Sequence, residues 1–217
     1  MLRLRVGRDS ESPLKVLCLG AHSDDIEIGC GGTILRLLEE NSGAIVHWVV
    51  FSSDAMRERE ARQAAELFLA SAKEKTIEAN RFPDTLFPSE MRGIKEHFQN
   101  LKARFSPDLI FTHFRNDLHQ DHRVICECTW NTFRDHLILE YEIPKYDGDL
   151  GAPNLFVPLD RHTCARKVKH ILATFKSQKQ KKWFTEETFR AMLRLRGIES
   201  NSATDYAEAF YCRKLVM

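Results

Sequence analysis

Short apolar runs alternate with segments of helical periodicity along the first two thirds of the chain. Runs rich in Val, Ile, Leu and Phe predict buried strands at residues 14–19, 44–51, 76–79 and 108–112. Apolar residues three or four positions apart predict helices at residues 33–40, 57–70, 89–105 and 121–133. Strands that alternate with helices indicate a parallel sheet covered on both faces. The predicted fold class is α/β, with a Rossmann-like, mostly parallel sheet and helices on both faces.

Local signals place several helix ends. Ser89 is a candidate cap for the helix at 89–105, and the Asn-Ser-Gly sequence at 41–43 ends the helix at 33–40. The glycines at positions 29, 31 and 32 do not form a G-x-G-x-x-G motif. They predict a turn of small residues that packs the start of the first helix against the candidate site described below.

The last third of the chain is less regular. Residues 144–158 hold three Pro and two Gly and predict a loop. Asp160 can cap a helix to about residue 175, Thr185 can cap another to about residue 196 that Gly197 closes, and residues 206–216 predict a final strand. Nothing marks a domain boundary. We expect a single domain over 1–217, with a motif-bearing core at about 13–135 and a less regular part at 136–217.

Charge and hydropathy exclude several classes of protein. The 32 Lys and Arg residues balance 31 Asp and Glu residues, so the net charge gives no reason to expect nucleic acid as a partner. The longest apolar run, residues 44–51, is too short to cross a bilayer, and residues 1–15 are charged where a secretory signal would be apolar. The six cysteines include no C-x-x-C pair. We therefore expect a cytoplasmic protein with reduced thiols and no membrane anchor, of unknown oligomeric state.

Polar residues gather directly after the first predicted strand. Residues 20–25 read Gly-Ala-His-Ser-Asp-Asp, which places His22, Asp24 and Asp25 at the carboxyl end of that strand. Open α/β sheets bind ligands at this end of their strands. Imidazole and carboxylate groups there must be paired, solvated or bound to a metal, and Zn²⁺ suits both types of ligand.

A second cluster of polar residues, called the second polar group below, follows the strand predicted at 108–112. Residues 113–122 hold three histidines and two aspartates, and His119 and His122 are one helical turn apart. Because the carboxyl ends of parallel strands lie at one edge of a sheet, the two groups can converge in space. A catalytic zinc takes three protein ligands and leaves one position for water. His22, Asp25 and one histidine of the second group would supply these three ligands.

The remaining polar side chains could supply the general base and the acid that amide hydrolysis needs besides the metal. The side chain of Asp24 diverges from that of Asp25, so Asp24 is free to act as general base toward a metal-bound water. A further histidine can stabilise the oxyanion and protonate the leaving amine. The spacing alone leaves open which histidine takes which role.

Each polar group has a simpler interpretation when taken alone. The first could be a turn with an N-cap Asp and a surface His, and the second could be the exposed start of a helix. Two other functions also fit: a non-catalytic module that binds a sugar or nucleotide, and a different metal hydrolase such as a phosphoesterase. The occurrence of both groups after buried strands favours the metal site. Asp24 distinguishes an enzyme from a binding module, which needs no base beside a metal ligand.

Two motifs resemble those of a known family. Residues 20–33 resemble the A-H-P-D-D-x-x-x-G-x-G-G-T signature of the LmbE-like, or PIG-L, N-acetylglucosaminyl deacetylases. Residues 117–122, Asp-Leu-His-Gln-Asp-His, resemble the second signature of that family, D-x-H-x-D-H. Ser23 and Gln120 stand where the family has Pro, which affects the stiffness of the loops and not the ligands.

The resemblance implies a role for each polar side chain. It implies one Zn²⁺ per chain, with Fe²⁺ as an alternative that the same ligand types tolerate. The zinc ligands that it implies are His22, Asp25 and His122. It further implies that Asp24 is the general base, that His119 stabilises the oxyanion or acts as acid, and that Asp121 orients His119.

Weaker matches concern the substrate. Residues 57–60 resemble an R-x-x-E helix start of the family, which implies that Arg57 faces the substrate. Pro83-Asp84 resembles a family P-D pair, which implies that Asp84 accepts hydrogen bonds from sugar hydroxyls. A helix-surface ion pair for Arg57 and a turn for Asp84 are the alternatives. Ser177-Gln178 resembles a late S-Q element, to which the sequence gives no role.

The substrate that the resemblance implies is an N-acetylated amino sugar or a conjugate of one. Residues 161–183 carry eight Lys or Arg and no Asp or Glu. This composition predicts a solvated amphipathic helix or, as the alternative, a patch for a phosphate-bearing substrate.

Overall fold

The computed structural model describes residue 6 and residues 12–216, so most of the charged segment 1–15 lies outside the described residues. The strands are β1 (Lys15–Gly20), β2 (Ile45–Val50), β3 (Glu74–Ala79), β4 (Leu109–His113), β5 (Leu137–Tyr141), β6 (Leu155–Leu159) and β7 (Tyr206–Cys212). The helices are α1 (Asp25–Glu40), α2 (Ala55–Phe68), α3 (Met91–Arg104), α4 (Gln120–Thr132), α5 (Arg161–Thr174) and α6 (Glu186–Glu199), with a 3₁₀ turn, η1 (Lys176–Gln178).

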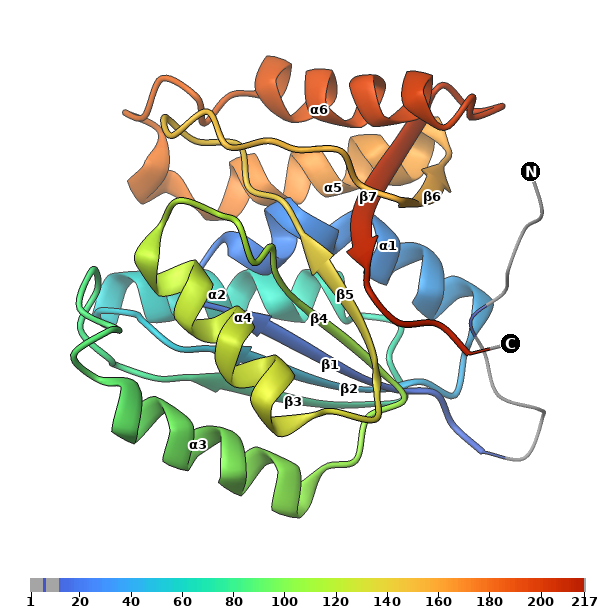
Figure 1. The fold of residues 1–217 in the computed structure, drawn as a ribbon. Helices are drawn as coiled ribbons and strands as arrows, with labels where there is room; N and C mark the ends of the chain where they lie inside the picture. Colours follow the sequence, from blue (N-terminus) through green and yellow to red (C-terminus); the bar gives the residue numbers. More distant parts are fainter. Residues whose placement is uncertain (1–5, 7–11, 217) are drawn as a thin grey trace.

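All seven strands form one sheet in the order β3-β2-β1-β4-β5-β7-β6 (Figure 1). The five strands from β3 to β5 are parallel to one another, and β7 runs antiparallel to both β5 and β6. Helices cover both faces of the sheet, with α3 and α4 on one face and α1, α2 and α5 on the other. The predicted fold class, a mostly parallel α/β sheet, is therefore confirmed.

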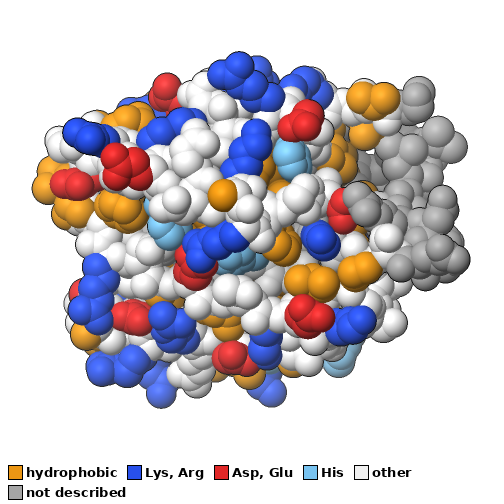
Figure 2. Space-filling view, turned by 90° about the horizontal axis from the view of Figure 1, so that it is seen from below, with side chains coloured by type: hydrophobic (Ala, Val, Ile, Leu, Met, Phe, Trp, Pro, Cys, Tyr) orange, Lys and Arg blue, Asp and Glu red, His pale blue; other side chains and the backbone are white. Residues whose placement is uncertain are grey.

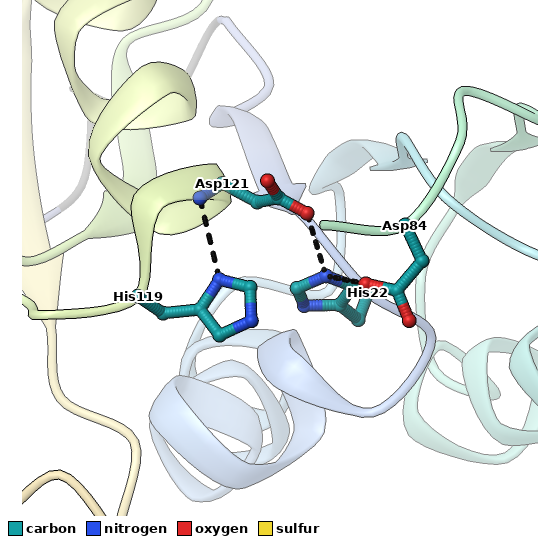
Figure 3. Close-up of side chains that lie close together, drawn as sticks. All are labelled: His22, Asp84, His119 and Asp121. Atoms are coloured by element: carbon teal, nitrogen blue, oxygen red, sulfur yellow. Dashed lines mark hydrogen bonds and ion pairs between the residues drawn. The ribbon is translucent and has the colours of Figure 1, made fainter. Parts of the chain in front are cut away.

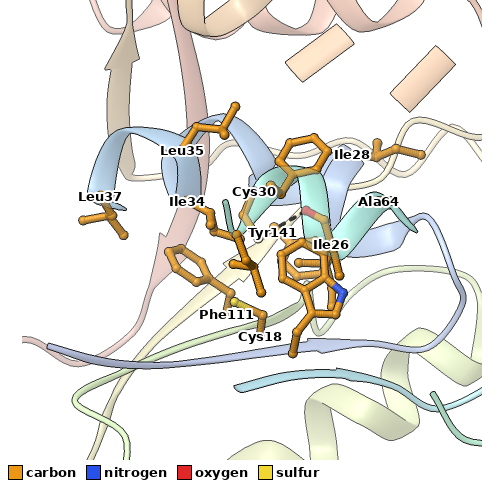
Figure 4. Packing of buried hydrophobic residues seen from close by; sticks show 14 of the residues in the cluster. Cys18, Ile26, Ile28, Cys30, Ile34, Leu35, Leu37, Ala64, Phe111 and Tyr141 are labelled. Atoms are coloured by element: carbon orange, nitrogen blue, oxygen red, sulfur yellow. Dashed lines mark hydrogen bonds between the residues drawn. The ribbon is translucent and has the colours of Figure 1, made fainter. Parts of the chain in front are cut away.

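Alternate residues of β1 enter two hydrophobic cores on opposite faces of the sheet. Val16 and Cys18 pack in the core beneath α1, α2 and α5, while Leu17 and Leu19 pack in the core beneath α3 and α4. Figure 4 shows part of the first core, where side chains of α1 pack around Cys18, Phe111 and Tyr141. A strand buried on both faces has no polar side to solvate, which explains why the sequence of β1 is a continuous apolar run.

The structure corrects the predicted start of the first helix. The sequence predicts a glycine-rich turn followed by a helix from residue 33, whereas α1 begins at Asp25 and includes all three glycines. Glycine is unfavourable inside a helix, but here close packing decides the residue type. A Cβ at Gly29 would lie 2.1 Å from Cδ2 of Tyr141, and one at Gly31 would lie 2.5 Å from Cε1 of Phe68. Because these glycines lack a Cβ, α1 packs closely against Tyr141 and Phe68. This packing fixes the position of the first turn of α1 next to the site.

We expect Gly29→Ala to lower the free energy of unfolding by roughly 2–3 kcal/mol, because the added methyl overpacks a closed core. The ring of Tyr141 is fully buried, and its hydroxyl donates to the carbonyl oxygen of Leu19 at 2.6 Å, so it has little freedom to move away. Gly43→Ala is the matched control, since its Cβ would meet no atom within 4 Å. Urea unfolding of both variants measures the difference; equal stabilities would contradict the packing argument.

The last third contains more regular structure than the sequence predicts. β5 has no counterpart among the predicted strands, and β6 lies largely within residues 144–158, which are predicted as a loop. Pro158 is tolerated in β6 because this strand lies at the edge of the sheet. The predicted final strand is confirmed as β7, although it ends at Cys212 and not at residue 216.

Two predicted helix caps are confirmed and two predicted helix ends are wrong. Asp160 and Thr185 each accept a hydrogen bond from the N–H group three residues later. Ser89 does not cap α3, because Glu90 occupies the N-cap position. Gly197 does not end α6, which continues to Glu199. A Cβ at Gly197 would lie 2.1 Å from the carbonyl oxygen of Asp205, so this glycine serves packing and not termination.

Candidate metal and active site

The two polar groups predicted to converge lie at one edge of the sheet. His22 follows β1 and residues 117–122 follow β4, and these two strands are paired in parallel. The segment after β3 brings Asp84 to the same place, where its carboxylate meets His22 (Figure 3). Parallel pairing therefore joins residues that are about 100 positions apart in the sequence, as His22 and His122 are.

His22, Asp25 and His122 form a compact set of three donor atoms, all within 4.8 Å of one another. Nδ1 of His22 lies 3.2 Å from Nε2 of His122 and 3.4 Å from Oδ2 of Asp25, and Nε2 of His122 lies 3.6 Å from the same Asp25 oxygen. Two imidazoles and one carboxylate are a ligand set that suits Zn²⁺. The three side chains expected to bind a metal are therefore close enough to share one ion.

The charges around His22 favour a cation. Burial opposes the charged imidazole, but hydrogen bonds to Asp121 and Asp25 outweigh this cost and raise the pKa of His22 well above its usual value. Burial also opposes ionisation of Asp25, but His122 and His113 lower the pKa of that carboxyl. Without a metal, the site thus stabilises a positive charge on His22, and a cation that binds there would have to replace this proton.

His122 is held in one orientation by a residue to which the sequence gives no role. Nδ1 of His122 lies 2.9 Å from Oδ2 of Asp117, so it donates there and leaves Nε2 with its lone pair toward Asp25. Burial, together with neighbouring His113, lowers the pKa of His122 to about 3, which keeps the ring neutral as a ligand must be. Lys145 lies 3.0 Å from the same Asp117 oxygen and links the loop after β5 to the site. Asp117 is detectable in sequence only as the first residue of the second motif.

Asp117→Asn should weaken metal binding by about 10–100-fold, the usual cost of losing an orienting carboxylate behind a histidine ligand. The amide retains the size of the carboxylate but not its charge, so His122 loses its ionic partner. Competition against a chromophoric chelator measures the affinity. Asp135→Asn is the control, because Asp135 is an exposed residue paired with His136 away from this edge. Unchanged affinity in Asp117→Asn would show that the contact does not support the ligand.

Asp24 lies beside the three-residue set and pairs with Arg57. Its Oδ1 accepts a hydrogen bond from Nη2 of Arg57 at 2.6 Å, and only 7 % of its side chain is exposed. Within the part of the chain that the structure describes, no hydrogen bond engages its Oδ2. The sequence treats Arg57 as a substrate contact or a surface charge, whereas the structure places it against Asp24 and largely buries it.

A second group of side chains surrounds the other nitrogen of His22 (Figure 3). Nε2 of His22 lies 2.9 Å from Oδ1 of Asp84 and 3.2 Å from Oδ2 of Asp121, and His119 is close enough to complete a four-residue cluster. A neutral imidazole has one lone pair, so His22 presents it to one of the two groups. The set with Asp25 and His122 differs from the second group in two ways: Asp117 orients His122 there, and both Asp25 and His122 are buried.

Asp121 differs from its expected arrangement. The resemblance implies that its carboxylate orients His119, but the carboxylate contacts His22 and accepts the backbone N–H groups of Thr85 and Phe87 at 2.7 and 3.2 Å. It is the backbone N–H of Asp121 that reaches His119, donating to Nδ1 at 3.3 Å. Burial and nearby His22 lower the pKa of His119. In the neutral ring, acceptance at Nδ1 leaves the proton on Nε2, which is then free to donate.

His113, the remaining histidine of the second group, forms the floor beneath His122. Its ring stacks on that of His122 with centroids 3.9 Å apart, and its Nε2 accepts the backbone N–H of Ala21 at 2.9 Å. This bond ties the end of β4 to the first residues after β1. His113 therefore supports the arrangement of the site, and its full burial excludes it from contact with a substrate.

The charged side chains of the outer surface are mixed in sign. On the face that carries α3, Lys and Arg side chains are interspersed with Asp and Glu (Figure 2). In the basic segment, Arg161, Arg166 and Lys167 pair with acidic residues on other elements. Among the helices of residues 12–216, none is both long and apolar enough to traverse a bilayer.

Comparisons with known proteins bear on the family and the fold of this chain. The family described as GlcNAc-PI de-N-acetylase (PIG-L) matches residues 17–133. The uncharacterized deacetylase YaiS of Escherichia coli (strain K12) is 29 % identical over 143 residues, which cover 60 % of this chain and 74 % of YaiS.

Two solved structures illustrate the likeness of the fold. The conserved protein TT1542 from Thermus thermophilus superposes with a TM-score of 0.72 at 22 % identity, covering 94 % of this chain and 96 % of that one. The N,N'-diacetylchitobiose deacetylase from Pyrococcus horikoshii superposes with a TM-score of 0.64 at 21 % identity, covering 91 % and 83 % of the two chains. Both likenesses therefore extend beyond the residues that the family model matches.

Proposed function

Because this chain belongs to the GlcNAc-PI de-N-acetylase (PIG-L) family of deacetylases, we propose that it is a zinc-dependent hydrolase that removes an N-acetyl group from an amino sugar or its conjugate. The observation that carries the proposal is the set of His22, Asp25 and His122, of which the last two are buried, with Asp24 next to Asp25 in the chain. A binding module would gain nothing from a carboxylate placed next to a metal ligand.

The three-residue set would hold the metal, with Zn²⁺ favoured and Fe²⁺ permitted by the same ligand types. A divalent cation held there would supply a Lewis acid and a nucleophile at neutral pH. Asp117 orients His122 for this role through the 2.9 Å contact to Nδ1, and Asp121 orients His22 from the opposite side. We expect one ion per chain, because the two groups around His22 share its single lone pair.

Asp24 acts as the base in this proposal. Its Oδ1 remains bonded to Arg57, while Oδ2 accepts the proton that water releases as its oxygen adds to the acyl carbon. When the C–N bond breaks, that proton passes to the leaving nitrogen and gives the free amine, while the second proton of the water remains on acetic acid, which then ionises to acetate. The same carboxylate thus serves both halves of the reaction, and no other proton donor is needed.

His119 and Asp84 complete the substrate contacts. The free Nε2–H of His119 donates to the oxyanion that forms on the acyl group, which favours oxyanion stabilisation over its alternative role as acid. The side chain of Asp84 is 67 % exposed and can accept hydrogen bonds from sugar hydroxyls. Arg57 binds the substrate, in this proposal, only through those N–H groups that its contacts with Asp24 and Ser177 leave available.

Acetate release, measured together with metal content on the same sample, tests the proposed function. The panel comprises N-acetylglucosamine, N,N'-diacetylchitobiose, a nucleotide-linked N-acetylglucosamine and a glycolipid headgroup. We expect metal-dependent release of acetate from at least one compound. A preference for the nucleotide-linked form would identify a phosphate-bearing substrate. Failure to bind any divalent metal after reconstitution would refute the proposal.

A further inference from the structure

A continuous set of polar contacts connects Asp24 to Ser177 in η1. Nη2 of Arg57 donates to Asp24, and Nη1 of Arg57 donates to the hydroxyl of Ser177 at 3.2 Å. The Ser177 hydroxyl donates in turn to Oε2 of Glu60 at 2.6 Å, and the backbone N–H of Ser177 donates to Oε1 at 3.0 Å. Three segments that are distant in the sequence therefore meet at one guanidinium group.

The contacts have a defined direction, which restricts the residues that can make them. Glu60 accepts both donors of Ser177, so the Ser177 hydroxyl oxygen is left to accept from Arg57. Only a side chain that donates and accepts at once can stand at position 177. The amide nitrogen of Gln178 also donates to this oxygen, at 3.0 Å, which strengthens its orientation.

Burial makes this arrangement costly to lose. The side chains of Arg57, Asp24 and Glu60 are only 15 %, 7 % and 11 % exposed, so solvent can replace few of the contacts. Two carboxylates flank the guanidinium, and the ring of Phe175 lies 5.8 Å from its central carbon. The planar guanidinium of an arginine is held in one orientation only while both of its Nη groups are hydrogen-bonded.

We propose that Glu60 and Ser177 are positioning residues that hold Arg57 against Oδ1 of Asp24 and so aim Oδ2 of Asp24 at the reacting water. This inference rests on the proposed function, in which Asp24 is the base. It gives the Ser177-Gln178 element a role: η1 orients the base from a distance through Arg57 and does not touch the substrate.

Kinetic constants of single variants test the inference. Ser177→Ala and Glu60→Gln should each lower kcat about 10–100-fold, the range expected when a reacting group is misplaced by a fraction of an ångström to an ångström. KM and metal content should stay within about twofold of the wild type. Ser177→Thr, which keeps the hydroxyl, should restore most of kcat, and Glu66→Gln on the same helix should have no effect because Glu66 is exposed and pairs with Lys75. Loss of metal, or a rise in KM alone, would overturn the proposal.

Combination with Arg57→Lys shows whether the two residues act through Arg57. Lysine keeps the charge but lacks the planar guanidinium, so Ser177→Ala should add less than about a twofold further loss in this background. If the two losses multiply in full, Ser177 acts by another route and the proposal is wrong.

A measurement without substrate separates this inference from the proposed function. In the wild type, slow rotation of the Arg57 guanidinium should give separate NMR signals for its two Nη groups, and Ser177→Ala should merge them. Separate signals in the Ser177→Ala variant would refute the positioning role. If the wild type releases no acetate but its Arg57 signals respond as stated, the proposed function fails while the link between Ser177 and Arg57 stands.

Discussion

Asp24→Asn is expected to lower kcat for acetate release by about 10²–10⁴-fold, the usual contribution of a general base. The amide keeps the shape of the carboxylate and one oxygen for Arg57, but it cannot take a proton from water. Asp24 is not one of the three proposed ligands, so metal content should remain at the wild-type level.

Steady-state kinetics and metal analysis on one preparation check this prediction. Asp135→Asn serves as the control, since its side chain is 83 % exposed and distant from the site edge. A variant that retains full activity with asparagine at position 24 would mean that another group acts as base. A variant that also loses its metal would mean that Asp24 is a ligand.

His122→Ala is expected to abolish metal binding and turnover together. The substitution removes one of three donor atoms and leaves the carboxylate of Asp117 with Lys145 as its partner, so no buried charge is left alone. A metal that binds only the folded state raises the melting temperature, and this rise should disappear in the variant. The substitution should therefore reduce the stabilisation by added metal more than it reduces the melting temperature of the metal-free protein.

Thermal unfolding with and without added Zn²⁺, followed by metal analysis, measures this effect. His162→Ala on the outer face of α5 is the matched control, because His162 is exposed. If His122→Ala still binds one ion per chain with wild-type affinity, the second cluster around His22, with Asp84, His119 and Asp121, holds the metal instead.

The sequence predicts those parts of the fold in which local pattern and burial agree. β1, β2 and β4 are largely buried and appear as mostly apolar runs, which His47 interrupts in β2 and Thr112-His113 end in β4. The first turns of α1 are missed because their glycines are selected by contacts with Tyr141 and Phe68, which local propensity does not contain. β6 is missed because Pro and Gly predict a loop, although an edge strand tolerates Pro158.

The candidate site is predictable to the extent that its residues occur in short motifs. His22, Asp24 and Asp25 lie within four consecutive positions, as do His119, Asp121 and His122, so their convergence follows from two parallel strands. Lys145 contacts Asp117 over 28 residues of sequence, and Ser177 contacts Arg57 over 120. No pattern of residue spacing predicts contacts between such distant segments. The direction of the Asp121 carboxylate is likewise set by the backbone of residues 85–87.

The close fit of Gly29 and Gly31 in α1, and of Gly197 in α6, determines how this enzyme could be evolved in the laboratory. Positions 29, 31 and 197 have no room for a side chain, so random substitutions there would remove variants from a library before activity could be selected. Leu86, Leu118 and Tyr146 are 51 %, 59 % and 70 % exposed, and Leu86 and Leu118 are close in sequence to Asp84 and His119. A library restricted to these three exposed positions would change surface side chains while leaving the frame of the site intact.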